Sequence, residues 1–89
     1  MLKVIKFSAV WCPPCNMLAP IFKKAMEELP GVAVELCDID ENPELTAKMN
    51  IKSVPTIVIL RDGKVMDAIV GLVKKEEIVA RVSALITKE

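Results

Sequence analysis

The sequence predicts an α/β fold, with a four-stranded mixed sheet flanked by three helices. The chain opens with an apolar strand, a long amphipathic helix and a second apolar strand, an order typical of parallel strands joined by a right-handed crossover. Further along, Asp62-Gly63 separates two apolar runs and indicates a tight antiparallel hairpin. An amphipathic segment after the hairpin is expected to form the last helix.

In the first half, residues 2–7 are expected to form a strand and residues 12–29 a helix that Pro30-Gly31 ends. Residues 32–39 follow as a second strand. Because this strand is largely apolar, we expect it to be buried on both faces of the sheet. Met17 and Met26 of the helix are expected in the core.

In the second half, a turn at residues 40–43 leads into a short helix near residues 44–49. Residues 56–60 and 64–70 are expected to form the two strands of the hairpin. The last helix is expected over residues 74–87, with an apolar stripe formed by Ile78, Val79, Val82, Leu85 and Ile86.

The composition favours a single domain that spans residues 1–89. Its 89 residues are 53% hydrophobic, which is enough for one packed core. The 12 basic and 12 acidic residues balance to a net charge of zero, which argues against nucleic acid or an anionic membrane as a partner. The absence of histidine excludes His-based catalysis and most zinc sites, so no metal is expected. We expect no signal peptide and no membrane span, and hence a cytoplasmic location.

Trp11-Cys12-Pro13-Pro14-Cys15 carries the chemistry that the sequence predicts. Two cysteines three residues apart, where a helix begins after a strand, are typical of a dithiol–disulfide redox centre. Cys12 is placed at the helix N-terminus, where unpaired N–H groups favour an anion, so we expect an exposed, stabilised thiolate that attacks disulfides. Cys15 is expected one turn inside, buried, as the resolving thiol. Pro13 and Pro14 suit the first helical turn, where a missing N–H costs little.

These features, taken in order, resemble the thioredoxin family in a shortened form. Besides the Trp-Cys-x-Pro-Cys centre, the resemblance rests on Pro20, residues 38–43 (Asp-Ile-Asp-Glu-Asn-Pro), Val54-Pro55-Thr56, the Asp62-Gly63 hairpin and Val70-Gly71. It covers nearly the whole chain, without the N-terminal strand and helix of full-length thioredoxins, so in size the chain is closer to glutaredoxins and small thioredoxin-like proteins. It implies the thioredoxin fold and the reduction of protein disulfides.

The resemblance also implies a site around the cysteine pair. Val54-Pro55 would be a cis peptide facing the disulfide, and the substrate-binding residues would be Trp11, Pro13, Pro14, Val54, Pro55, Val70, Gly71 and Leu72. No bound cofactor is implied beyond the redox-active pair of Cys12 and Cys15. Electrons would come from NADPH through a thioredoxin-reductase-like flavoprotein, and a monomer would act on disulfide-containing proteins.

Lys6 departs from the family pattern, because thioredoxins usually carry a buried aspartate six residues before the first cysteine. Leu36 departs too, at a position where a lysine often partners that aspartate. A buried, unpaired ammonium is costly, so Lys6 must reach water, pair with an acid or lower its pKa. We expect its amine to reach water near Cys15, where a cation would stabilise a thiolate and make the protein a stronger oxidant.

Several alternatives remain open at this point. A glutaredoxin-like enzyme would draw on glutathione, and a non-enzymatic binding module would dispense with the cysteines. A structural zinc would need more ligands than Cys12, Cys15 and Cys37 supply. Cys37, in a strand, is interpreted as a small apolar core residue, with a regulatory thiol as the alternative.

Overall fold

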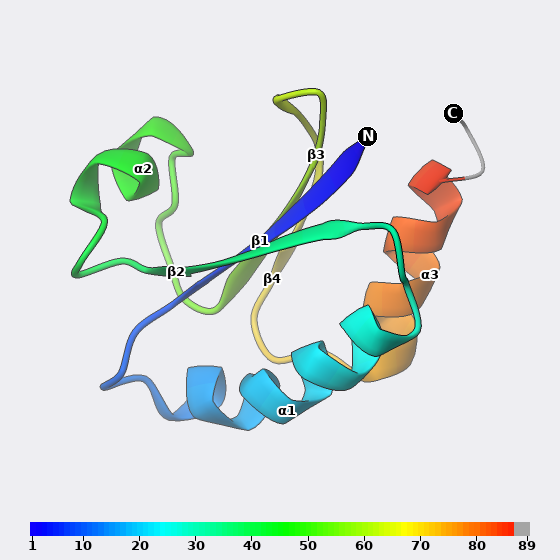
Figure 1. The fold of residues 1–89 in the computed structure, drawn as a ribbon. Helices are drawn as coiled ribbons and strands as arrows, with labels where there is room; N and C mark the ends of the chain where they lie inside the picture. Colours follow the sequence, from blue (N-terminus) through cyan, green and yellow to red (C-terminus); the bar gives the residue numbers. More distant parts are fainter. Residues whose placement is uncertain (87–89) are drawn as a thin grey trace.

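The first strand lies in the interior of the sheet and has a neighbour on each side (Figure 1). In this computed structural model, which describes residues 1–86, the strand order is β2-β1-β3-β4. β1 pairs in parallel with β2 and antiparallel with β3, and β3 pairs antiparallel with β4. The predicted four-stranded mixed sheet with three helices is therefore confirmed.

The elements follow one another along the chain as β1 (Leu2–Ser8), α1 (Pro13–Glu27), β2 (Ala33–Asp38), α2 (Pro43–Lys48), β3 (Thr56–Arg61), β4 (Lys64–Val70) and α3 (Lys75–Ile86). Each predicted element is present, with ends that differ from the prediction by at most two residues. The helix predicted to end at Thr87 is described to Ile86, and Thr87 lies outside the described residues.

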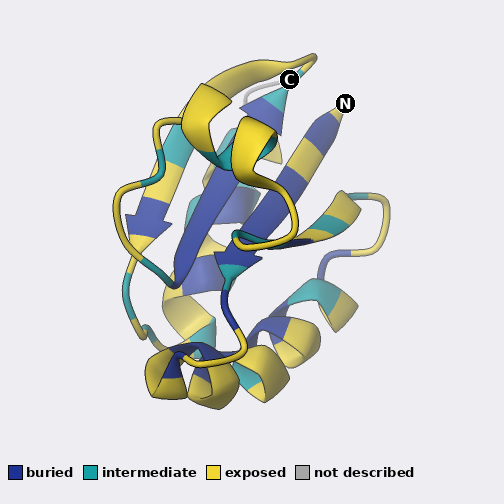
Figure 2. Cartoon of the chain, turned by 90° about the vertical axis from the view of Figure 1, so that its left-hand side faces the viewer, coloured by how far each residue is buried: buried dark blue, intermediate teal, exposed yellow. Residues whose placement is uncertain are grey.

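Two hydrophobic clusters hold the layers together, one on each face of the sheet. α1 and α3 lie on one face, where Val4 of β1 packs with Leu18, Ile78 and other buried residues. α2 lies on the other face, where Phe7 of β1 belongs to the second cluster. Figure 2 shows the two middle strands almost continuously buried, while the outer faces of the helices are exposed. No helix within residues 1–86 is long and apolar enough to cross a membrane.

α1 begins at Pro13, one residue later than expected, because Cys12 keeps an extended backbone (φ −102°, ψ 106°) and caps the helix. Pro13 and Pro14 occupy the first two helical positions, where no intrahelical N–H bond is lost. The chain leaves the helix through Gly31, whose φ of +95° suits glycine. The expectation that Met17 lies in the core is wrong: its side chain is exposed on the outer face of α1, whereas Met26 packs against the core.

The expectation that the second strand is buried on both faces is wrong. β2 lies at the edge of the sheet, so its outer side has no neighbouring strand among the described residues. Val34 and Leu36 are exposed on one face, Leu36 to 67%. Only Cys37 of β2 is buried, in the cluster on the side of α2. Apolar composition predicted burial on both faces, but at the edge of the sheet Val34 and Leu36 are left uncovered.

The hairpin and the last helix agree with their sequence signals. Asp62 (φ 51°) and Gly63 (φ 85°) form the turn, as expected for an Asp-Gly hairpin whose two central residues have positive φ. Ile78 and Val82 of α3 are fully buried, while Ile86 at its end is exposed. The apolar stripe therefore packs most tightly in the middle of α3.

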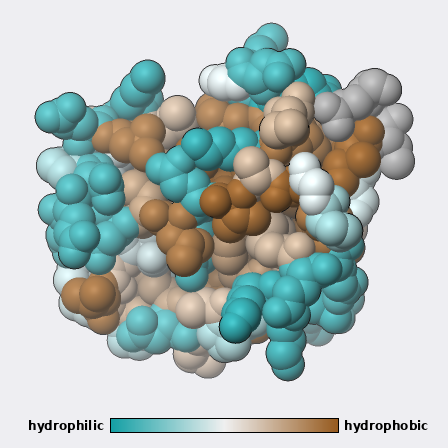
Figure 3. All heavy atoms as spheres, in the orientation of Figure 1, coloured by the Kyte–Doolittle hydropathy of each residue, from teal (hydrophilic) through white to brown (hydrophobic). Residues whose placement is uncertain are grey.

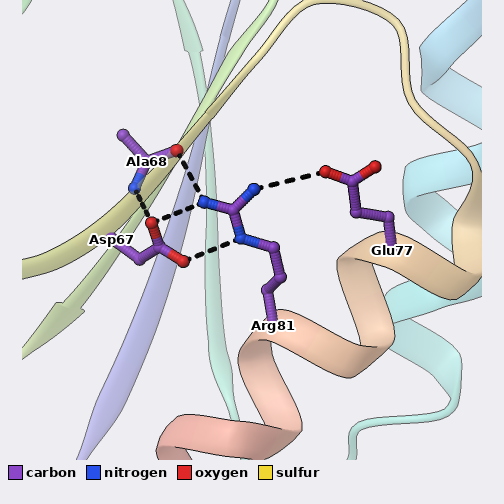
Figure 4. A network of polar contacts seen from close by, with 4 residues as sticks. All are labelled: Asp67, Ala68, Glu77 and Arg81. Atoms are coloured by element: carbon purple, nitrogen blue, oxygen red, sulfur yellow. Dashed lines mark hydrogen bonds and ion pairs between the residues drawn. The ribbon is translucent and has the colours of Figure 1, made fainter.

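Arg81 ties α3 to β4 through a compact polar network (Figure 4). Its Nε donates to Asp67 Oδ2 at 2.9 Å and its Nη2 donates to Asp67 Oδ1 at 2.6 Å. The same guanidinium donates to the Ala68 carbonyl at 3.1 Å and to Glu77 Oε2 at 3.2 Å. A two-point bond of this kind fixes the orientation of the helix on the sheet as well as its distance.

Asp67→Asn is expected to lower the free energy of unfolding at pH 7 by about 1 kcal/mol, because it removes a partly exposed, screened ion pair. The bond to Arg81 lowers the pKa of Asp67, so its stabilising effect is present above the unfolded pKa, about 3.9, and is lost as the pH falls through the folded value. In urea unfolding, the free energy of unfolding of Asp67→Asn should fall below that of the unchanged protein at pH 7, and the difference should become smaller in acid. Glu77→Gln is the control: it weakens one longer contact to Arg81 and should lower the free energy of unfolding by less. A loss of stability in Asp67→Asn that does not change with pH would contradict this account.

Candidate active site

A disulfide between Cys12 and Cys15 closes the first turn of α1. The two Cα atoms are 5.2 Å apart, within the usual range for a disulfide. Cys12 is the N-cap residue, and its Sγ accepts a hydrogen bond from the backbone N–H of Cys15 at 3.3 Å. The sulfur therefore occupies the position at which a helix N-terminus holds an anion.

Both sulfurs are shielded from water, which corrects the expectation that Cys12 is exposed. Cys12 is 4% exposed and Cys15 is 2% exposed. They pack with Ala9, and Ile39 and Val54 cover the same small cluster. The two thiols thus differ in their places on the helix rather than in exposure.

The loop before β3 faces the disulfide, as the resemblance implied. Val54-Pro55 is a cis peptide bond, and the Val54 carbonyl oxygen lies 3.7 Å from Cys12 Sγ. The Gly71 N–H donates to the Pro55 carbonyl at 2.9 Å, and Val70 pairs with Thr56 across the hairpin strands. This pairing brings Val54, Pro55, Val70 and Gly71 together from two separate parts of the chain.

Several apolar side chains are exposed in the segments next to the cysteine pair. Some are neighbours of the cysteines in the sequence, and others are brought near by the pairing of β4 with β3. Trp11 is 62% exposed, and Val70 and Leu72 are exposed at the end of β4 and beyond it. Pro13 and Pro14 are exposed on the first turn of α1. Exposed large apolar side chains at one site are typical of a surface that binds another molecule.

Asp40 is a residue that the sequence reasoning did not single out. Its Oδ2 accepts a hydrogen bond from Trp11 Nε1 at 2.7 Å, which holds the indole ring beside the disulfide. Asp38 orders the same turn, since its Oδ1 accepts from the Asp40 N–H at 2.8 Å. A cavity of about 290 Å³ lies between Trp11 and Val54. The only signal in the sequence was the acidic turn after β2, which does not reveal a partner 29 residues away.

Lys6 lies elsewhere than expected. The residue is 6% exposed, and its Nζ lies 5.4 Å from the centroid of the Phe22 ring rather than beside Cys15. Phe22 is two turns of α1 beyond Cys15, about 10 Å along the helix axis. The stem of Lys6 is buried but its amine is not fully enclosed, and partial burial lowers the amine's pKa, so the structure combines the first and the third of the three outcomes considered for it.

Cys37 is a core residue, as the sequence predicted. It is buried on the α2 face among Ile5, Phe7 and their neighbours, and burial raises the pKa of its thiol.

Within residues 1–86, no three potential ligands among Asp, Glu, Cys and His side chains are grouped to hold a metal ion.

Comparison with known proteins places this geometry in a family. The family model for thioredoxin matches residues 1–84. The chain is 38% identical over 78 residues to thioredoxin from Staphylococcus haemolyticus, covering 86% of this chain and 75% of that protein. It is 37% identical over 82 residues to thioredoxin from Chlamydia trachomatis, covering 92% and 80% respectively.

Solved structures agree. Thioredoxin from Trypanosoma brucei brucei superimposes with a TM-score of 0.90 at 30% identity, over 98% of this chain and 76% of that one. A thioredoxin variant from Halobacterium salinarum superimposes with a TM-score of 0.85 at 31% identity, over 93% and 73%.

Cys37 is expected to react slowly with iodoacetamide in the folded, reduced protein, because its thiol is buried and its pKa is raised. Mass spectrometry of tryptic peptides should find label at Cys12 well before Cys37. Cys37→Ala should keep disulfide reduction and cost about 1 kcal/mol of stability from lost packing. Loss of most activity in Cys37→Ala would instead assign this thiol a part in the reaction.

Proposed function

The chain belongs to the thioredoxin family and is a thiol–disulfide oxidoreductase, and from this premise we propose that Cys12 is its attacking thiol and Cys15 its resolving thiol. The observation that carries the assignment is the cap of α1: Cys12 Sγ accepts the Cys15 N–H at the helix N-terminus. A backbone N–H and the helix dipole both favour a thiolate at that place over a neutral thiol.

The reaction proceeds in two exchanges of sulfur bonds. The Cys12 thiolate attacks one sulfur of a substrate disulfide, forming a mixed disulfide and releasing the other substrate sulfur as a thiolate, which takes up a proton. The Cys15 thiol loses its proton, and the thiolate attacks Cys12 Sγ. The Cys12–Cys15 disulfide forms, and the second substrate sulfur leaves and is protonated. Two electrons have passed to the substrate, and the protein is left in the oxidised form that the structure describes.

The substrate segment binds beside Cys12 in this proposal, along the loop that ends at Pro55. The Val54 carbonyl, 3.7 Å from Cys12 Sγ, is positioned to pair with the backbone of an extended chain. In this proposal the rest of the docking surface is formed by Trp11, Pro13, Pro14, Val70, Gly71 and Leu72. Apolar side chains next to the reacting sulfur suit the unfolded or flexible regions where protein disulfides are accessible.

The proposal extends to the electron donor and the location. Disulfide-containing proteins are the substrates that the family suggests, and a flavoprotein reductase that uses NADPH would return the electrons. No cofactor other than the cysteine pair takes part. The protein acts as a monomer in the cytoplasm, a reducing compartment that suits a disulfide reductase.

Lys6 remains our candidate for tuning the redox potential, although its amine lies over Phe22 and not beside the sulfurs. A partly buried cation is screened by water less than a fully exposed one, so its effect extends further. In this proposal it stabilises the thiolates, and hence the reduced form, from the body of the sheet.

Reduction of insulin disulfides tests the assignment of the two thiols. Cys12→Ser should abolish turnover, because no thiolate remains at the helix N-terminus to attack. Cys15→Ser should trap substrate as a mixed disulfide through Cys12, which nonreducing gels and peptide mapping would detect. Cys37→Ser is the control and should turn over. Trapping through Cys15 in a Cys12→Ser protein would reverse the roles, and turnover without Cys12 would favour a binding module.

The source of electrons is tested in the same assay. NADPH with a thioredoxin reductase should sustain turnover, whereas glutathione with glutathione reductase should not. Sustained turnover with glutathione alone would favour the glutaredoxin-like alternative.

The redox potential tests Lys6. Lys6→Met should make the potential more negative, and Lys6→Asp more so, because each removes a charge that favours thiolates and the second adds one that opposes them. Equilibration with glutathione buffers measures the potential. Lys3→Met, which removes an exposed lysine from the same strand, should leave it unchanged. Equal potentials in all four proteins would assign Lys6 no part in tuning.

A further inference from the structure

The cavity between Trp11 and Val54 adjoins the reacting sulfur. Its volume is about 290 Å³, and the residues that line it are Trp11, Ile39, Thr46, Ile51, Lys52, Ser53 and Val54. Two of these residues, Ile39 and Val54, also pack against the cysteine pair. The Val54 carbonyl lies 3.7 Å from Cys12 Sγ, so a substrate segment bound at this carbonyl lies at the mouth of the cavity.

One wall of the cavity is held in place by polar contacts. The Trp11 Nε1–H donates to Asp40 Oδ2 at 2.7 Å, and the Asp40 backbone N–H donates to Asp38 Oδ1 at 2.8 Å. The indole ring is exposed, yet these two bonds fix its position at the edge of the cavity. A preformed cavity lowers the entropic cost of ordering its walls around a bound side chain.

The lining offers an incoming side chain apolar contacts and one cation. The apolar lining residues are Trp11, Ile39, Ile51 and Val54. Thr46 Oγ1 donates to the Asn42 carbonyl at 2.7 Å, so its hydroxyl proton is already used. Lys52 is exposed, and within residues 1–86 it has no acidic partner. An aliphatic side chain is therefore favoured inside the cavity, and a carboxylate is favoured over an ammonium beside Lys52.

Apolar surface continues from the cavity into the loop between β1 and α1. Val10 and Trp11 in this loop are 79% and 62% exposed. Figure 3 shows hydrophobic atoms at the surface in several places, one of them at the lower left, where this loop lies in the same view in Figure 1. The surface around the cavity thus suits the apolar part of a substrate segment.

We propose that the cavity is a subsite for one substrate side chain, a large aliphatic one next to the reacting cysteine, in a segment that carries an acidic residue near Lys52. The inference rests on the proposed function, because it needs Cys12 to attack the substrate disulfide. Small-molecule sites usually measure about 300–1,000 Å³, so a cavity below this range suits a single side chain. Asp40 is then a positioning residue that acts through the Trp11 ring, and Lys52 sets the preference for charge.

Symmetric peptide disulfides test the subsite on the unchanged protein. Ala-Cys-Ala, Leu-Cys-Ala and Ala-Cys-Leu, each as a disulfide-linked dimer, are mixed with the prereduced full chain, and the liberated peptide thiols are measured after an acid quench. Each rate constant is divided by that for dithiothreitol, so that differences in intrinsic reactivity cancel. One leucine peptide should react about tenfold faster than Ala-Cys-Ala, because leucine buries more apolar surface. The other should gain less than about twofold, because the cavity lies to one side of Cys12.

The possible failures of this experiment are distinguishable. Equal rates for the three peptides, or an equal gain on both sides of the cysteine, would overturn the subsite and leave the proposed function standing. Failure to reduce any of the three peptides would overturn the proposed function and this inference with it.

Charge selection is tested with glutamate or lysine placed next to the favoured leucine. The glutamate peptide should react about two- to fivefold faster, the range expected for an exposed ion pair, and Lys52→Glu should reverse the order. Lys48→Glu makes the same change of charge at an exposed lysine outside the lining, and it should keep the order. An unchanged order in Lys52→Glu would refute the role of Lys52.

The positioning role of Asp40 is tested by the ratio of the favoured leucine rate to the Ala-Cys-Ala rate, which a general loss of activity would not alter. Asp40→Ala removes the acceptor of the Trp11 N–H and should reduce this ratio at least twofold. Asp40→Asn keeps an acceptor oxygen and should retain most of it. An equal ratio in Asp40→Ala and the unchanged protein would show that Asp40 does not act through the cavity.

Discussion

The corner between β1 and α1 is the constraint on which the rest of this structure depends. β1 ends at Ser8, and within four residues the chain turns, the Cys12 N–H bonds the Ala9 carbonyl at 3.2 Å, and Cys12 caps the helix. Because β1 is an interior strand, its end is fixed by pairing on both sides. Because α1 packs against one face of the sheet, its direction is fixed as well. The Cys12 sulfur is thereby held at the N-terminus of α1.

The rest of the site is brought to this corner by the sheet. β3 pairs with β1, so the loop before β3 must arrive next to the end of β1, and its Val54 carbonyl meets Cys12 Sγ. β4 pairs with β3, which brings Val70 and Gly71 to the same edge. The bond from Arg81 to Asp67 then fixes α3 on β4 (Figure 4). Each of these elements is held in place by backbone pairing or by a two-point ion pair. Residues that are far apart in the sequence therefore lie close to the Cys12 sulfur.

Local signals in the sequence accounted for most of the architecture. The Asp62-Gly63 turn, the prolines at the start of α1 and the apolar period of α3 each specify a local conformation that neighbouring residues suffice to determine. They could not specify which strand lies at the edge of the sheet. β2 is as apolar as an interior strand, and its exposure follows from strand order, a property of the whole chain. The burial of Cys12 was missed for the same reason, since Ile39 and Val54 cover it from distant parts of the chain. The environment of Lys6 likewise depends on where α1 crosses the sheet.

The open edge of β2 bears on how this protein behaves at high concentration. An edge strand presents unpaired backbone N–H and C=O groups to water. Apolar side chains beside them favour edge-to-edge pairing with the sheet of another copy, and so aggregation. Val34 and Leu36 supply that apolar surface, while Glu35 of the same strand is paired with Lys3 of β1. Net charge adds little repulsion between copies, because 12 basic and 12 acidic residues without histidine leave it near zero throughout the neutral pH range. Colloidal stability should therefore be low across that range, and a change of buffer from pH 6 to pH 8 should alter it little.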